Sequence, residues 1–167
     1  VLLTLVLSGS YFGYTYWRIH RYDDLIARVA KTYRLDAKLV RSVVYEESYF
    51  DPSAKSRVGA LGLMQITPVV VTEWEQTSGD TAEPRKFVQY WVKKYPHVAP
   101  NKNNPSSGEL LTNPEINLHI GCWYLDHLRQ RFTDETQKLP MMLAGYNAGP
   151  SLAQVIHIAH RGTEEHL

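Results

Sequence analysis

EESYFDPSAKSRVGALGLMQITP, from Glu46 to Pro68, is the stretch that decides the fold, and it lies between two segments with helical patterns. It begins with adjacent glutamates and continues through proline, serine and glycine, residue types that favour turns. The glycines at 59 and 62 allow backbone angles that other residues avoid, and they let the backbone approach a ligand closely. The stretch therefore predicts a turn-rich loop directly behind a helix that ends near Ser48.

The helix before this loop places one glutamate on its apolar face. Glu47 follows Val40, Val43 and Val44 by seven, four and three positions, and these offsets share one side of an α-helix. Burial of a carboxyl group favours its neutral form and raises its pKa, as a proton donor in general acid catalysis requires. A glutamate that turns out to solvent at the helix end is the alternative. From periodicity alone, Glu46 is nearly as good a candidate.

The rest of the chain also carries helical signals. Apolar spacing, capping residues and helix-starting prolines predict further helices over Asp23–Tyr33, from Asp36 to about Ser48, from Pro68, over Pro84–Tyr95, from Asn113 and Pro114, over Met141–Tyr146 and over Leu152–His160. The prolines, glycine and asparagines between Tyr95 and Leu111 predict a loop. No segment alternates with period two over any length, so we expect an all-α fold, with at most a short irregular hairpin around Gly59 to Leu63.

Size and charge exclude several classes of protein. A chain of 167 residues with 44% apolar content fits one globular domain with a real core. Its net charge of +1 provides no strong field for a polyanion, so nucleic acid is not an expected partner. The single cysteine, Cys122, lies in an apolar helical pattern and is interpreted as a buried free thiol.

The amino-terminal segment has the pattern of a membrane helix that meets an interface. Val1 to Trp17 contain no charge and end in aromatic residues, and Arg18, His20 and Arg21 follow. We expect residues 1–21 to form a membrane anchor with a basic flank, and residues 22–167 to form the globular domain. A cleaved signal peptide and a buried core helix are the alternatives. The basic flank by itself favours a cytoplasmic body, and we expect a segment before Val1 to be missing.

The stretch from Glu46 to Pro68 resembles the signature of the lytic transglycosylase domain. In that family the glutamate directly before the serine is the catalytic acid/base, which here is Glu47. The other matching positions are Pro52, Ala54, Ser56, Gly59, Ala60, Gly62, Leu63, Met64 and Gln65 in this stretch, Asn117, Gly121, Tyr124 and Leu125 in a second block, and Ala144, Tyr146, Asn147, Ala148 and Gly149 in a third. The resemblance covers about Leu25 to Pro150 and implies a lysozyme-like α-helical domain with a cleft for glycan strands.

The resemblance also implies a set of substrate-binding residues. These are Ser56, Gly62, Met64, Gln65, Tyr124, Tyr146 and Asn147. Serine and glutamine offer hydrogen bonds to hydroxyl and acetamido groups, and methionine offers an adaptable apolar wall. Without the resemblance, Met64 is interpreted as a core residue. The asparagine and glycine at positions 147 and 149 are then interpreted as the turn that ends a helix.

Two features depart from the family pattern. The segment from Val69 to Thr112 is longer than the family usually has, and it could form a lid or a docking surface. The family also supplies a tyrosine after the third block, and this chain reaches Leu167 without one. We therefore expect that the chain is truncated at this end, which puts its full activity in doubt.

The resemblance implies cleavage of peptidoglycan between N-acetylmuramic acid and N-acetylglucosamine with 1,6-anhydro ends. Most glycosidases need two carboxylates, and the matching blocks offer only Glu47. No metal or other cofactor is expected. The expected location is the bacterial cell envelope, on the outer face of the cytoplasmic membrane, and further envelope partners stay unknown. A hydrolysing goose-type lysozyme and a catalytically silent peptidoglycan-binding protein are the rival interpretations.

Overall fold

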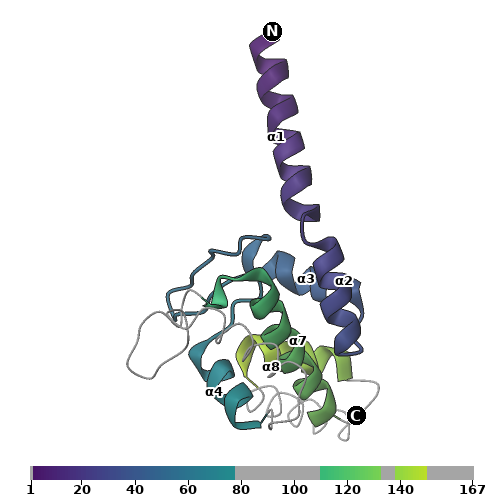
Figure 1. The fold of residues 1–167 in the computed structure, drawn as a ribbon, viewed down its shortest axis with the longest axis vertical. Coiled ribbons are helices and arrows are strands. Elements are labelled where there is room, and N and C mark those ends of the chain that lie inside the picture. The colour runs from purple at the N-terminus through teal and green to yellow at the C-terminus, as the bar shows by residue number, and fades with distance from the viewer. Residues whose placement is uncertain (1, 78–109, 133–137, 150–167) are drawn as a thin grey trace, which may run out of the picture. The chain divides into compact units, whose positions relative to one another are not determined.

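The computed structural model describes residues 2–77, 110–132 and 138–149 (Figure 1). The helices in these ranges are α1 (Leu2–His20), α2 (Asp23–Thr32), α3 (Ala37–Ser48), α4 (Pro68–Thr77), α7 (Pro114–Arg131) and α8 (Lys138–Ala148). The described ranges contain no strand and only two isolated bridges, between Lys55 and Leu61 and between Leu61 and Ile66. The all-α prediction is confirmed, and these bridges lie where the short hairpin was expected.

The chain divides into two compact units, Val1–Gly121 and Cys122–Leu167. Each unit is described by itself below. The predicted boundary after residue 21 is a different division, and it stays a prediction. The helices predicted over Pro84–Tyr95 and Leu152–His160 lie outside the described residues, as does nearly all of the loop predicted between Tyr95 and Leu111.

Helices α2 and α3 pack together through their apolar faces. Ile26, Val29 and Ala30 are the buried residues of α2, and Val40, Val43 and Val44 are those of α3. The predicted cap of α3 is present, because a side-chain oxygen of Asp36 accepts a hydrogen bond from the backbone nitrogen of Lys38 at 2.8 Å. The apolar stripe that leads to Glu47 is therefore part of the core of the first unit.

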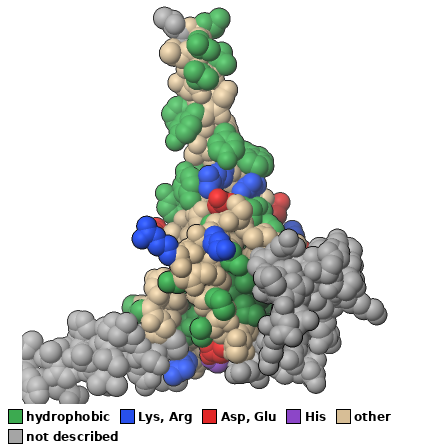
Figure 2. Space-filling view, turned by 90° about the vertical axis from the view of Figure 1, so that its left-hand side faces the viewer, with side chains coloured by type: hydrophobic (Ala, Val, Ile, Leu, Met, Phe, Trp, Pro, Cys, Tyr) green, Lys and Arg blue, Asp and Glu red, His purple; other side chains and the backbone are tan. Residues whose placement is uncertain are grey.

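Helix α1 contains no buried residue. Figure 2 shows hydrophobic side chains along its surface and basic side chains at the end nearest α2. Leu2, Leu3, Tyr11, Phe12 and Trp17 are all more than half exposed. Among the described residues, no helix is both long and apolar enough to cross a membrane.

The loop between α3 and α4 is fixed to the start of α7 by one asparagine. Asn117 is fully buried. Its Oδ1 accepts from the backbone nitrogen of Met64 at 2.7 Å, and its Nδ2 donates to the carbonyls of Leu61 and Leu111, each at 2.8 Å. Helix α7 starts where predicted, because Oδ1 of Asn113 accepts from the first-turn backbone nitrogens.

In the second unit, α8 starts at Lys138, three residues before the predicted Met141. Pro140 lies in its first turn, where the missing N–H costs no helical hydrogen bond. The helix ends in the glycine turn expected from its sequence. Gly149 has a φ of 86°, and its backbone nitrogen donates to the carbonyl of Gly145 at 3.0 Å.

Candidate active site

Glu47 lies in the last turn of α3, half-buried, whereas the adjacent Glu46 is exposed. Burial raises the pKa of the Glu47 carboxyl above its ordinary value of 4.5, and repulsion from Glu46 raises it further. This is the direction predicted from the apolar stripe. A carboxyl group in this state stays protonated to higher pH than a solvated one, so it can deliver a proton.

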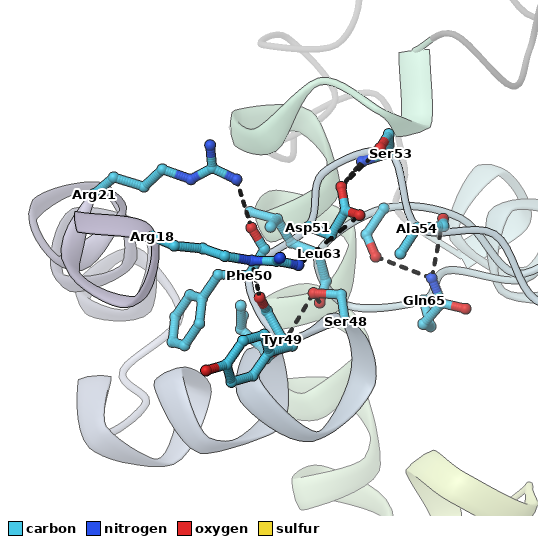
Figure 3. A network of polar contacts seen from close by, with 12 residues as sticks. Arg18, Arg21, Ser48, Tyr49, Phe50, Asp51, Ser53, Ala54, Leu63 and Gln65 are labelled. Atoms are coloured by element: carbon cyan, nitrogen blue, oxygen red, sulfur yellow. Dashed lines mark hydrogen bonds and ion pairs between the residues drawn. The ribbon is translucent and has the colours of Figure 1, made fainter. Parts of the chain in front are cut away.

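The end of α3 is held from the loop side by Ser48. Its hydroxyl donates to the carbonyl of Leu63 at 2.8 Å and also lies 3.1 Å from the carbonyl of Val44 (Figure 3). Directly after it, Tyr49 and Phe50 both adopt left-handed backbone angles, with φ of 50° and 60°. Such angles are uncommon for large residues, so α3 stops abruptly and the chain turns into the loop.

Two of the predicted binding residues brace this loop from within. Nε2 of Gln65 donates to the carbonyls of Ala54 and Gly62, each at 3.1 Å. Figure 3 shows the amide oxygen of Gln65 directed away from these two partners. The hydroxyl of Ser56 accepts from the backbone nitrogen of Ala60 at 3.0 Å. Both side chains therefore shape the loop, and the role of each toward a glycan stays a prediction.

Gly62 is required by its surroundings. It has a φ of 78°, and a Cβ at this position would collide with the side-chain amide of Asn117 and the carbonyl of Leu111. Met64 is fully buried, as the interpretation without the family resemblance expected. Its side chain packs where a Cβ on Gly121 would otherwise lie. Met64 shapes the loop from the core side, and its contact with a glycan stays a prediction.

The remaining predicted binding residues lie in the second unit. The rings of Tyr124 on α7 and Tyr146 on α8 are in contact, with centroids 5.5 Å apart. Tyr124 is buried, Tyr146 is half-buried and Asn147 is exposed. The structure therefore brings Tyr124 and Tyr146 together in this unit, and groups Ser56, Gly62, Met64 and Gln65 in the loop that follows Glu47 in the first.

Sequence reasoning assigned no role to three residues that hold this region. Asn117 had a signal, because it is one of the positions that match the family signature and a polar residue between two apolar ones, Ile116 and Leu118. Arg18 and Arg21 were interpreted only as a basic flank. In the structure they donate to the carbonyls of Tyr49 and Phe50, at 2.9 Å and 2.7 Å.

Comparison with known proteins matches this arrangement to one family. The family model described as "Transglycosylase SLT domain" matches residues 24–90 and 93–161, which is most of the chain. The chain belongs to this family. The match includes Glu47, the loop behind it and the Tyr124 to Asn147 region, so the three blocks of the sequence signature lie inside the SLT domain.

Named relatives agree with this assignment. The SLT domain is 33% identical over 126 residues to membrane-bound lytic murein transglycosylase E of Buchnera aphidicola, covering 75% of this chain and 48% of that protein. It is 32% identical over 129 residues to the soluble lytic murein transglycosylase of Escherichia coli, covering 77% of this chain and 16% of that protein. The chain thus spans about half the length of the first relative and less of the second.

A solved structure supports the same fold. The 70 kDa soluble lytic transglycosylase of Escherichia coli superposes with a TM-score of 0.55 at 29% identity, covering 80% of this chain and 18% of that one. A complex of the 70 kDa soluble lytic transglycosylase with bulgecin A superposes with a TM-score of 0.57 at 27% identity, covering 89% of this chain and 20% of that one. These likenesses identify the fold as that of the lytic transglycosylase domain.

Proposed function

We propose that this chain is a peptidoglycan lytic transglycosylase in which Glu47 is the single catalytic acid/base. The observation that carries the proposal is the half-buried Glu47 carboxyl, whose pKa is raised and which directly precedes the serine of the sequence signature. Its substrate is the glycan strand of peptidoglycan, cleaved at the bond from N-acetylmuramic acid to N-acetylglucosamine.

The proposed reaction uses one carboxyl group twice. Protonated Glu47 first donates its proton to the glycosidic oxygen, so that the bond to the muramoyl anomeric carbon breaks and the N-acetylglucosamine end leaves as an alcohol. The muramoyl 2-acetamido group stabilises the positive anomeric carbon. The Glu47 carboxylate then accepts the proton of the muramoyl 6-hydroxyl, whose oxygen bonds to the anomeric carbon. The product is a 1,6-anhydro end, and Glu47 is protonated again.

Two rivals predict other products from the same fold. A goose-type lysozyme uses water in the second step and leaves a reducing end. A silent peptidoglycan-binding protein cuts nothing. Digestion of isolated sacculi followed by mass spectrometry distinguishes the three, with wild-type chain and Glu47→Gln side by side. Anhydromuropeptides from the wild type alone support the proposal, whereas reducing ends or an absence of soluble product from folded chain contradict it.

We also propose that α1 attaches the domain to a membrane in the bacterial envelope. The support is the exposure of its apolar side chains, since an exposed apolar surface of this extent marks an interaction site, together with the aromatic and basic residues at its end. The lytic murein transglycosylases named above include a membrane-bound one. With the domain on the outer face of the cytoplasmic membrane, α1 would keep Glu47 near the bilayer.

A further inference from the structure

Two arginines, Arg18 in the last turn of α1 and Arg21 directly after it, contact the residues that follow the proposed acid/base. Nε of Arg18 donates to the carbonyl of Tyr49 at 2.9 Å, and an Nη of Arg21 donates to the carbonyl of Phe50 at 2.7 Å. Figure 3 shows both guanidinium groups reaching from the α1 side to this turn. The two carbonyls belong to consecutive residues, and each receives its own charged donor.

These two carbonyls belong to the strained pair that ends α3. Tyr49 and Phe50 both have positive φ, a conformation that persists in large residues only where the surroundings impose it. The Phe50 side chain is fully buried, and the guanidinium of Arg41 lies over its ring, 5.2 Å from the centroid. The arginines of α1 fix the backbone oxygens of the same pair. Charged donors make stronger hydrogen bonds than neutral ones, so they can hold an unfavourable turn.

The arginines are themselves fixed by rings and by a carboxylate. The guanidinium of Arg18 lies over the ring of Tyr49 at 4.9 Å, and an Nη atom lies 3.9 Å from Oδ2 of Asp51. Arg21 lies over the rings of Trp17 and Tyr22, each at 4.7 Å. Nε of Arg21 is buried and has no hydrogen-bond partner among the described residues. An unpaired buried donor costs free energy, so the hydrogen bond from the Nη of the same partly buried guanidinium to Phe50 is a contact that helps keep Arg21 in this position.

We propose that Arg18 and Arg21 are positioning residues, which hold the Tyr49–Phe50 turn and thereby fix the Glu47 carboxyl at the end of α3. The inference rests on the proposed function of Glu47 and adds to it that the end of α1 is part of the catalytic framework. The link is short in the chain, because Glu47, Ser48, Tyr49 and Phe50 are consecutive. Ser48 ties the same helix end to the loop, so the arginines and Ser48 hold it from two directions.

The test compares Arg18→Ala, Arg21→Ala and Arg21→Lys in the full chain in detergent, with Arg28→Ala as the control. Arg28 is exposed on α2, and its substitution by alanine removes the same positive charge far from the turn in the sequence. Because a misplacement of about 1 Å can cost about 100-fold in rate, we expect kcat to fall by about 10-fold to 100-fold in the alanine variants. KM should change little, and Arg21→Lys should recover part of kcat, because lysine can still donate to the carbonyl.

A second readout does not depend on turnover. Nuclear magnetic resonance of the carboxyl carbons reports the pKa of Glu47 directly, and loosening of the helix end admits water to this group. The pKa of Glu47 should therefore move down toward its ordinary value in the alanine variants and stay unchanged in Arg28→Ala. An unchanged pKa with unchanged kcat per folded molecule overturns the inference, as does a raised KM with unchanged kcat. A wild-type chain that releases no anhydro product contradicts the proposed function, while the pKa readout still tests the positioning.

Discussion

The position of Glu47 on α3 gives two adjacent carboxylates different environments. Glu46 faces solvent, and Glu47 is half-buried at the end of the stripe formed by Val40, Val43 and Val44. Burial is the larger cause of the raised pKa of Glu47, and the Glu46 charge is the smaller. Two neighbouring carboxylates on one helix therefore differ in burial, and the more buried one is the proposed acid/base.

The first prediction concerns the identity of the acid/base. Glu47→Gln removes the transferable proton and keeps the shape, so we expect turnover on sacculi to fall by ~100-fold to ~10,000-fold, toward the upper end because one group serves both steps. Glycan binding should be retained. Glu46→Gln should do much less. If Glu47→Gln kept most of its activity, or if Glu46→Gln were the more damaging change, the catalytic residue would be misassigned.

The second prediction is a pH dependence of turnover. The first step needs protonated Glu47, so kcat/KM should fall as pH rises through its raised pKa. Glu46→Gln removes the repulsion that favours the protonated form, and this limb of the profile should therefore shift to lower pH. Asp24→Asn, an exposed change on α2, serves as the control and should leave the limb unmoved. A limb that stays in place in Glu46→Gln would contradict the electrostatic account.

The third prediction is the matching dependence of stability. A group whose pKa is higher in the folded chain than in the unfolded chain binds its proton more tightly when folded. Wild type therefore loses stability as pH rises from about the ordinary value of 4.5 through the folded pKa. Glu47→Gln lacks this loss. Urea unfolding across this pH range should show that the variant gains stability relative to wild type as pH rises. If the free energies of unfolding of the two proteins changed in parallel with pH, the prediction would be wrong.

At the scale of elements, the loop behind α3 depends on a buried hydrogen-bonding centre. Asn117 makes one accepted and two donated hydrogen bonds with three backbone groups, two of them in the loop, at Leu61 and Met64, and one before α7, at Leu111. Gly62 gives this amide the space that it needs. Further side-chain hydrogen bonds to the backbone of the loop come from Ser56, Gln65 and Ser48. The conformation of the loop therefore depends first on the buried Asn117 and then on hydrogen bonds within the loop.

The fourth prediction tests this centre. Asn117→Ala removes the hydrogen bonds of two buried backbone groups, the nitrogen of Met64 and the carbonyl of Leu111, whereas the carbonyl of Leu61 keeps its bond from the nitrogen of Ile66. At about 1 to 3 kcal/mol for each buried group, we expect the free energy of unfolding to fall by about 2 kcal/mol or more. Asn113→Ala removes the cap of the same helix and should cost ~1 kcal/mol. Urea denaturation measures both. Equal losses would mean that Asn117 acts only as a helix residue.

Helix starts could be predicted from the sequence, and the contacts around the site could not. Asp36, Pro68 and Asn113 act on neighbours within a few residues, so their signals are local. The bond from Arg18 joins residues 31 positions apart, and that from Asn117 to Leu61 joins residues 56 apart. Periodicity carries no information about such pairs. The apolar stripe before Glu47 is also a local signal, but it left Glu46 nearly as good a candidate, and the resemblance to the family signature selected Glu47.

At the scale of the whole molecule, α1 differs from the other helices that the structure describes. It has no buried residue, yet its last turn contributes to the turn that follows Glu47. Anchoring and catalysis would then share one stretch of about four residues. From the sequence, the aromatic residues followed by basic ones were interpreted as a membrane interface. The contacts of Arg18 and Arg21 with Tyr49 and Phe50 are visible only in the structure.

The fifth prediction tests membrane attachment. The full chain should float with liposomes of bacterial lipid in a density gradient, because exposed apolar side chains favour a lipid environment. A variant that begins at Trp17 keeps both arginines and the ring that lies against Arg21, and it should stay in the soluble fractions with its activity on sacculi largely intact. Full-length chain that stays with the soluble fractions would contradict attachment through α1.

The central claim, that Glu47 activates an internal hydroxyl in place of water, is tested most directly by digesting sacculi in heavy-oxygen water. The 6-hydroxyl oxygen comes from the substrate, so the products should carry no solvent oxygen, and each anhydro end should be lighter by one water than the corresponding reducing end. Mass spectrometry reads both properties in one experiment, and hen-type lysozyme provides a hydrolysing control. Muropeptides that carry the heavy oxygen at a reducing muramic acid would show that this chain is a hydrolase.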